Sequence, residues 1–205
     1  MKIAVVGGAG RTGALIVSEA RRRGDDTVAV VRRADAETEG PRAIADARNV
    51  AALRAAIRGC DAVAFAVGPT ASTPDHTVMR DSMAAVLEAM AAEKVRRIVM
   101  VGAEGPWRGS GDPLTRFVAK PILNRVMAGS MGDPYASEVL LRGSDARWTA
   151  IRPAQLTDGS STRHRRRRER SLWFGMQTTR RATAAAVLDA LHDDATVGAS
   201  YSVAR

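Results

Sequence analysis

The stretch Lys2–Gly13, KIAVVGGAGRTG, decides the fold of this 205-residue chain. Its apolar segment Ile3–Val6 predicts a buried β-strand, and three glycines follow at a spacing of three residues: Gly7, Gly10 and Gly13. Glycines at this spacing let the chain turn tightly, bring its backbone close to a pyrophosphate group and pack the next helix against the strand. The stretch therefore predicts a dinucleotide-binding turn.

The residues after the turn agree with this interpretation. The segment Ala14–Arg23 has an apolar side and a charged side, as a surface helix does. The first N–H groups of such a helix, together with the positive end of its dipole, bind anions without a charged side chain. The residues expected to hold the phosphates are Gly7, Gly10, Arg11, Thr12 and Gly13. The alternative is that the glycines serve only a close strand-to-helix turn.

The next apolar run, Thr27–Arg32, is a second predicted strand, and it ends in a pair of arginines. An NAD site of this kind carries an acidic residue about 20 positions after the turn to bind the ribose 2′-OH, whereas a 2′-phosphate is bound by arginine. Arg32 and Arg33 occupy this position and favour NADP over NAD. Asp35 lies close by, and arginines at a strand end can also be plain solvated charges, so both alternatives stay open at this point.

The rest of the chain alternates apolar runs with amphipathic segments. The further predicted strands are 43–45, Asp61–Val67, Arg97–Val101, Trp148–Arg152 and Ser200–Val203, and the further predicted helices are Ala47–Arg58, Thr77–Glu93, Leu114–Met127, Pro134–Arg142 and Thr179–His192. This alternation predicts an α/β fold, a Rossmann-like doubly wound parallel sheet in three layers. At this length we expect one domain over residues 1–205, with any substrate pocket built from loops.

Basic residues are in excess and are unevenly distributed. The formal net charge is +9, and Arg163–Arg170, RHRRRRER, holds six arginines in eight residues. In an extended run both faces would be charged, which suits a solvated edge strand. The run contains no aromatic residue on which a base could stack. We therefore expect weak, sequence-independent polyanion binding that is lost as salt rises.

Composition also bears on the cellular location of the protein and on whether it has disulfides or metal sites. No apolar run reaches the roughly 18–20 residues of a membrane span, so we expect a cytoplasmic protein without a membrane partner. The single cysteine, Cys60, excludes an intramolecular disulfide, and its place at the start of an apolar strand predicts a buried, unreactive thiol. The three histidines and the carboxylates show no metal-ligand spacing, so we expect no metal site.

Several segments together resemble a known family. They are GGAGRTG at Gly7–Gly13, RIVMVG at Arg97–Gly102, SEVLLRGSDARWTAIRPAQLTDG at Ser137–Gly159 and TTRRATAAAVLDAL at Thr178–Leu191. In this order they resemble the NAD(P)H-binding atypical short-chain dehydrogenases/reductases, which include flavin reductase/biliverdin reductase B-like and NmrA-like proteins. The resemblance covers essentially the whole chain.

The resemblance implies where the rest of the cofactor would lie. The nicotinamide would contact the edge residues Ala66, Val67, Gly68, Gly102 and Pro153. Asp46 and Ala47 would line the adenine, although Asp46 can equally be the N-cap of the helix predicted after it.

Catalytic groups are harder to find. Many relatives carry a serine or threonine pair where this chain has Gly102 and Ala103, and the YxxxK pair of conventional short-chain dehydrogenases is absent because Val139 stands four residues after Tyr135. Without a lysine to lower its pKa, Tyr135 is a weak candidate for an acid or base. His76 is expected in an exposed loop. Asp133 is either an acidic position shared with the relatives or the N-cap of a helix that begins at Pro134.

The leading functional hypothesis is an NADPH-dependent reductase that transfers a hydride to a planar small-molecule acceptor such as a flavin, a quinone or a tetrapyrrole. Such acceptors need no protein hydroxyl if they stack on the nicotinamide. The first alternative is a non-catalytic NADP-binding sensor of the NmrA-like kind. Direct nucleic-acid binding through Arg163–Arg170 and an isomerase or epimerase reaction are further alternatives.

Overall fold

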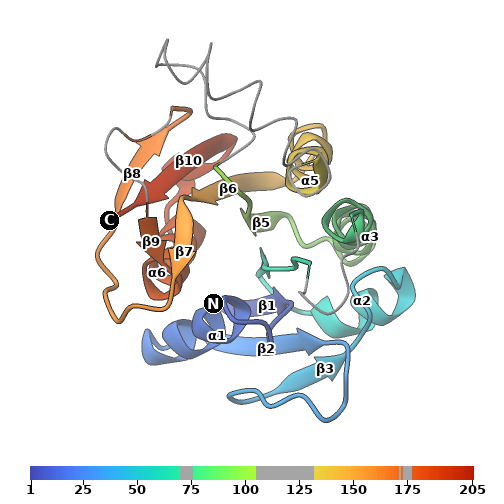
Figure 1. Ribbon diagram of the computed structural model, residues 1–205. Coiled ribbons are helices and arrows are strands. Elements are labelled where there is room, and N and C mark those ends of the chain that lie inside the picture. Colours follow the sequence, from blue (N-terminus) through green and yellow to red (C-terminus); the bar gives the residue numbers. More distant parts are fainter. Residues whose placement is uncertain (70–75, 105–131, 171, 173–176) are drawn as a thin grey trace.

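The computed structural model describes residues 1–69, 76–104, 132–170, 172 and 177–205. Its main strands are β1 (Lys2–Val6), β2 (Asp26–Val31), β3 (Arg42–Ile44), β4 (Ala62–Phe65), β5 (Arg97–Val101), β6 (Arg147–Pro153), β8 (Arg165–Arg168) and β10 (Ala199–Ala204). They form one eight-stranded sheet in the order β3-β2-β1-β4-β5-β6-β10-β8. Every neighbouring pair is parallel except β10 and β8 (Figure 1).

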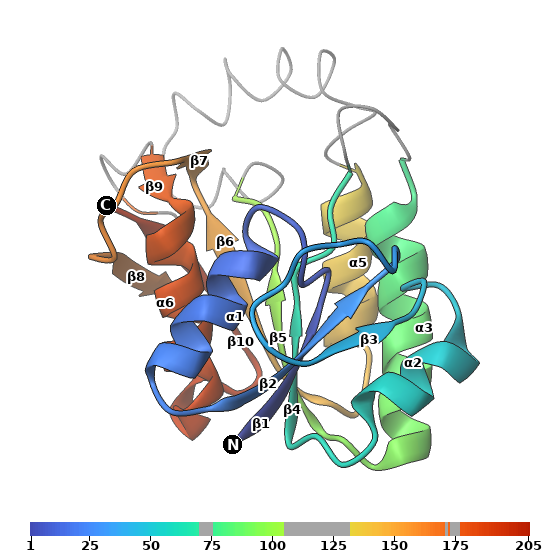
Figure 2. The same cartoon turned by 90° about the horizontal axis from the view of Figure 1, so that it is seen from below.

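Helices cover both faces of this sheet. They are α1 (Gly13–Arg22), α2 (Val50–Ile57), α3 (Val78–Glu93), α5 (Gly132–Arg142) and α6 (Arg180–Leu191). Helices α1 and α6 lie on one face, and α2, α3 and α5 lie on the other (Figures 1 and 2). The expected three-layer Rossmann-like fold is confirmed. A short parallel pair, β7 (Gln155–Thr157) with β9 (Gln177–Thr179), and the 3₁₀ turn η3 (Asp194–Thr196) complete the described elements.

Two hydrophobic clusters hold the layers together, and strand alternation explains them. Side chains along a strand point to opposite faces in turn. On β1, Ile3 and Val5 belong to the cluster that includes residues of α1 and α6. Ala4 and Val6 belong to the other cluster, with residues of α2 and α3. Because both faces are covered, β1 is apolar at four consecutive positions, as parallel sheets require.

The strand order reverses at β1, which lies between β2 and β4. The connections therefore leave the carboxyl end of β1 in opposite directions, and ligands of open α/β sheets bind in the crevice that results. Backbone hydrogen bonds join the three strand ends there. The N–H groups of Gly7 and Gly8 donate to the Val30 carbonyl at 3.1 and 3.2 Å, and the Ala66 N–H donates to the Val6 carbonyl at 2.9 Å.

Two expected helix caps are wrong. The helix predicted from Ala47 begins at Val50, and its N-cap is Asn49, whose side-chain oxygen accepts the Ala52 N–H at 3.0 Å. Asp46 does not cap it. Its carboxylate instead accepts the Arg48 N–H at 2.9 Å in the turn before the helix.

Asp133 is likewise not the N-cap of its own helix. It lies inside the first turn of α5, and its carboxylate accepts the N–H groups of Met79 and Arg80 at 2.7 and 2.8 Å. These are orphan donors at the start of α3, so Asp133 caps a neighbouring helix. Local sequence does not reveal which helix a carboxylate will cap.

The arginine-rich run forms an edge strand, as predicted. Strand β8 pairs only with β10 in the described sheet, in antiparallel register. The guanidinium of Arg166 lies over the ring of Tyr201, 5.4 Å from its centroid, as in a cation–π contact, and it pairs with Asp193 at 3.0 Å. The expected helix Leu114–Met127 falls outside the described residues.

Two further expectations concern the cysteine and membrane-spanning segments. Cys60 is buried, and burial raises the pKa of its thiol, which agrees with an unreactive side chain. Within the described ranges, no helix combines the length and the apolar character needed to cross a membrane.

Candidate functional site

The glycine turn after β1 contains three positions that tolerate no side chain: Gly7, Gly8 and Gly13. A Cβ on Gly8 would lie 2.8 Å from a side-chain atom of β2. Gly7 has a φ of +84°, and a Cβ there would lie 2.8 Å from the Ala66 carbonyl oxygen. A Cβ on Gly13 would overlap the carbonyl oxygen of Gly7. At Gly10, by contrast, a Cβ would have one near neighbour among the described residues, the Gly7 carbonyl oxygen at 3.1 Å. Gly7, Gly8 and Gly13 are therefore required by packing, whereas Gly10 presents its open side outward.

The start of α1 offers free donors next to Gly10. No hydrogen bond among the described residues uses the N–H groups of Arg11, Thr12 or Gly13, and the Thr12 side chain makes no capping bond. The first turn of α1 holds no acidic residue. Unused N–H groups at a helix N-terminus bind anions. This part of the predicted site fits a pyrophosphate.

The two arginines after β2 differ in their surroundings. Both are exposed. The Nε of Arg33 lies 3.3 Å from a carboxylate oxygen of Asp35, which is also exposed. Arg32 makes no hydrogen bond or ion pair with any described residue. Arg33 therefore has an acidic neighbour, whereas Arg32 has no ionic partner among the described residues.

The adenine candidates lie one strand further along the same edge. The N–H of Ala45 donates to the Val31 carbonyl at 2.8 Å, which fixes the end of β3 beside the end of β2. Asp46 and Ala47 follow directly after Ala45. They therefore lie along the same carboxyl edge as Arg32.

The nicotinamide candidates come together at the carboxyl ends of β4, β5 and β6. Ala66 and Val67 are half-buried and Gly68 is exposed. The Gly102 N–H donates to the Ile151 carbonyl at 2.8 Å. Two residues later, the Glu104 N–H donates to the Pro153 carbonyl at 3.2 Å. Gly102 and Pro153 are therefore neighbours across two strands that are distant in the sequence.

A buried ionic network, which no local sequence pattern indicates, lies beneath this edge. Glu138 on α5 is 1% exposed and accepts from both Nε and a terminal nitrogen of Arg152 on β6, at 3.0 and 2.5 Å. Its Oε1 also accepts from the Ser200 hydroxyl at 2.7 Å and from Arg142 at 3.0 Å. Burial favours the neutral acid, but the hydrogen bonds from Arg152 and Ser200 outweigh it and hold the pKa of Glu138 below its usual value.

Glu104 is a second carboxylate that the sequence analysis did not select. It follows the hydroxyl-free tip of β5 and is 6% exposed. Its Oε2 accepts the Ser202 hydroxyl of β10 at 2.5 Å, whereas its Oε1 has no partner. The signal that could have found it is its position two residues after Gly102.

The other two candidate residues, Tyr135 and His76, are exposed. Tyr135 lies in the first turns of α5, one turn before Glu138, with 45% of the residue exposed. His76 is exposed before α3, as predicted.

Two basic residues share one carboxylate beside the glycine turn. Asp158 forms an ion pair with Arg11 of the glycine turn and a second ion pair, at 2.5 Å, with Arg180 at the start of α6. These two ion pairs connect the β1–α1 turn and the start of α6 to Asp158, the residue that follows β7. Asp158 therefore places a negative charge beside Arg11, one of the residues predicted to bind the phosphates.

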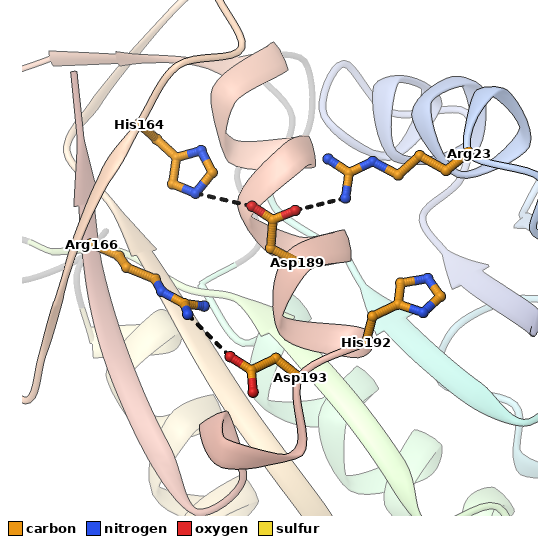
Figure 3. Close-up of a pocket in the computed structure, with 6 residues that line it drawn as sticks. All are labelled: Arg23, His164, Arg166, Asp189, His192 and Asp193. Atoms are coloured by element: carbon orange, nitrogen blue, oxygen red, sulfur yellow. Dashed lines mark hydrogen bonds and ion pairs between the residues drawn. The ribbon is translucent and has the colours of Figure 1, made fainter.

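A separate pocket of about 640 Å³ lies between the C-terminal ends of α1 and α6 and strand β8 (Figure 3). It is lined by Arg23, His164, Arg166, Asp189, His192 and Asp193. Asp189 lies between Arg23 at 2.7 Å and His164 at 3.4 Å, and Arg166 points to Asp193 (Figure 3). None of the sequence-predicted cofactor residues lines it. Its charges are already matched in pairs, which leaves little net attraction for a ligand.

The fold and the crevice define an NAD(P)H-binding class of protein, and comparison with known proteins agrees. A profile of the NAD(P)H-binding family matches residues 7–194. The chain belongs to this family. The comparison with curated proteins found no match.

Solved structures resemble the whole chain. A protein of Streptococcus pneumoniae, provisionally described as an NADH-flavin reductase, superposes with a TM-score of 0.85 at 23% identity, over 100% of this chain and 99% of the other. A short-chain dehydrogenase/reductase of Veillonella parvula in complex with NADP superposes with a TM-score of 0.82 at 18% identity, over 100% and 94%. At these identities the likeness establishes the fold alone.

Proposed function

We propose that this protein is an NADPH-dependent reductase whose acceptor is a planar small molecule such as a flavin, a quinone or a tetrapyrrole. The observation that carries the cofactor assignment is the junction of the glycine turn with β2. Gly7 and Gly8 are hydrogen-bonded to Val30, two residues before the unpaired Arg32. A pyrophosphate held by Arg11, Thr12 and Gly13 would therefore leave the adenosine ribose beside Arg32, where a guanidinium favours a 2′-phosphate.

The acceptor class follows from the groups at the other end of the crevice. Gly102 and Ala103 offer no hydroxyl that could polarise an ordinary carbonyl, and Val139 stands where a lysine would assist Tyr135. When bound, NADPH supplies a hydride, and a conjugated planar acceptor takes it together with a proton from solvent. The chain's own task is to hold the acceptor flat against the nicotinamide and to keep water away from the contact.

Titration and turnover test this proposal. NADPH is expected to bind in calorimetry, and its absorbance is expected to fall when a flavin, menadione or biliverdin is added. Simple aldehydes and ketones should be reduced far more slowly. NADPH binding without turnover of any planar acceptor would contradict the reductase assignment and favour a cofactor-binding sensor.

Replacing Arg32 by alanine should remove the preference for NADPH over NADH. Hydrogen bonds to charged groups contribute about 1.5–3 kcal/mol, which corresponds to roughly a ten- to hundredfold loss of NADPH affinity. NADH affinity should change little. Arg96→Ala is the matched control, because Arg96 is exposed at the opposite edge of the sheet, before β5. A wild-type protein that binds both cofactors equally would show that Arg32 is only a solvated charge.

Replacing Asp158 by asparagine should strengthen NADPH binding by roughly two- to fivefold. The change removes a negative charge near the phosphates and releases Arg11 and Arg180, and exposed charge interactions are worth about 0.2–1 kcal/mol. The gain should shrink as salt rises. Asp145→Asn, at an exposed turn after α5, is the control. Weaker binding in Asp158→Asn would instead mean that Asp158 holds the two arginines in position.

A further inference from the structure

The unpartnered oxygen of Glu104 is the starting point. Buried polar atoms in folded proteins nearly always have a hydrogen-bond partner, and an exception calls for a physical explanation. Five buried side-chain atoms lack one in the described part of the chain, and Oε1 of Glu104 is the one carboxylate oxygen among them. Leaving a carboxylate oxygen buried without a donor is costly. A ligand that supplies a donor removes that cost.

The structure holds Glu104 firmly in place. Its backbone N–H donates to the Pro153 carbonyl at 3.2 Å, and its Oε2 accepts the Ser202 hydroxyl at 2.5 Å. These two bonds tie the residue to β6 and to β10. The carboxylate is thus oriented through one oxygen, and its second oxygen, Oε1, is buried and makes no hydrogen bond.

The position of Glu104 relates this oxygen to the acceptor. Glu104 lies two residues after Gly102 and is bonded to Pro153, and both of these residues belong to the predicted nicotinamide edge. The carboxyl end of β10, which carries Ser202, lies beyond β6 in the sheet order. An acceptor stacked on the nicotinamide would therefore have its outer edge near Glu104.

We propose that Oε1 of Glu104 is a recognition group for the acceptor, and that it selects planar molecules with an N–H donor at the ring edge. A carboxylate accepts hydrogen bonds and cannot donate one. The imide N–H of a flavin and the pyrrole N–H of a tetrapyrrole meet this requirement, whereas a quinone offers only carbonyl oxygens. This inference rests on the reductase function proposed above and narrows its substrate class.

A pair of flavins differing in one atom group tests the proposal. Lumiflavin carries the imide N–H, and 3-methyllumiflavin carries a methyl group in its place. The wild type is expected to show a kcat/KM about 10–100-fold higher for lumiflavin, the range for a hydrogen bond to a charged group. Menadione, which has no N–H, serves as the third acceptor.

Glu104→Met removes the acceptor oxygen at similar size. It should lower kcat/KM for lumiflavin by the same factor and leave 3-methyllumiflavin and menadione within about threefold, with unchanged NADPH affinity. Glu88→Met, at an exposed position on α3, is the control and should behave as wild type. An equal loss for all three acceptors, or no loss for any, would overturn the proposal.

Binding separates this proposal from the reductase function. Oxidised lumiflavin is expected to bind the NADP⁺-loaded wild type more tightly than 3-methyllumiflavin by the same factor, as measured by flavin fluorescence, and Glu104→Met should abolish that difference. If the difference is present but no acceptor is reduced, the Glu104 site stands and the reductase function is wrong. If the two flavins bind equally, or neither binds, the Glu104 site is wrong whatever the turnover.

Discussion

Gly10→Val is expected to reduce NADPH affinity at least about 100-fold, a loss of roughly 2.7 kcal/mol, while the protein stays folded. Within the described part of the chain, a Cβ at Gly10 meets the Gly7 carbonyl oxygen at 3.1 Å, so the turn has to shift by only a few tenths of an ångström. The added side chain would instead occupy the space in front of the unused N–H groups of Arg11, Thr12 and Gly13. Calorimetric titration measures the affinity, and circular dichroism with thermal melting reports the fold.

Two other glycines provide the controls. Gly13→Ala should lower the melting temperature strongly, because its Cβ would overlap the Gly7 carbonyl oxygen. Gly143→Val, at the end of α5, should bind NADPH normally, since a Cβ there finds ordinary contacts at 3.5 Å or more. If Gly10→Val binds NADPH as tightly as the wild type, the turn has a structural role alone.

Glu138→Gln is expected to destabilise the protein by about 3–5 kcal/mol, the usual cost of breaking a buried ion pair by removing one partner. The substitution leaves the guanidinium of Arg152, whose side chain is 4% exposed, without its carboxylate. Urea unfolding should show a lower midpoint with an unchanged slope. Glu88→Gln, on the exposed side of α3, should shift stability by no more than about 0.5 kcal/mol.

A second variant and the pH dependence of stability test the Glu138–Arg152 ion pair further. Glu138→Gln combined with Arg152→Met should lose less stability than Glu138→Gln alone, because no uncompensated charge remains in the pair. The folded-state pKa of Glu138 lies below the ordinary value of 4.5, so its contribution is complete above that pH. The contribution disappears as the pH falls through the folded-state pKa. The gap between the wild type and Glu138→Gln should therefore narrow in acid, and a gap independent of pH would contradict the assignment.

Local sequence predicted the class of the fold, a doubly wound parallel sheet, which the structure confirms. The apolar run on β1 and the glycine spacing after it predicted the turn that joins β1 to α1. The charged alternation of the Arg163–Arg170 run predicted an edge strand, and β8 occupies that place. These features depend on residues close together in the chain, whose periodicity reports which faces are buried. For the same reason the family resemblance, carried by short contiguous motifs, was found correctly.

Tertiary structure alone decided the polar contacts. Asp133 caps α3 across 54 residues of sequence, and Ser202 reaches Glu104 across 98. The same holds for Arg152. The sequence motif shows it only as the residue before a proline, whereas in the folded protein it is hydrogen-bonded to Glu138. Hydrogen bonds of this kind depend on distances between elements that no local spacing encodes. The sequence therefore predicted the glycine turn from which the crevice opens. Packing of distant strands and helices decided which carboxylates form ion pairs, and it left Oε1 of Glu104 buried without a partner in the described part of the chain.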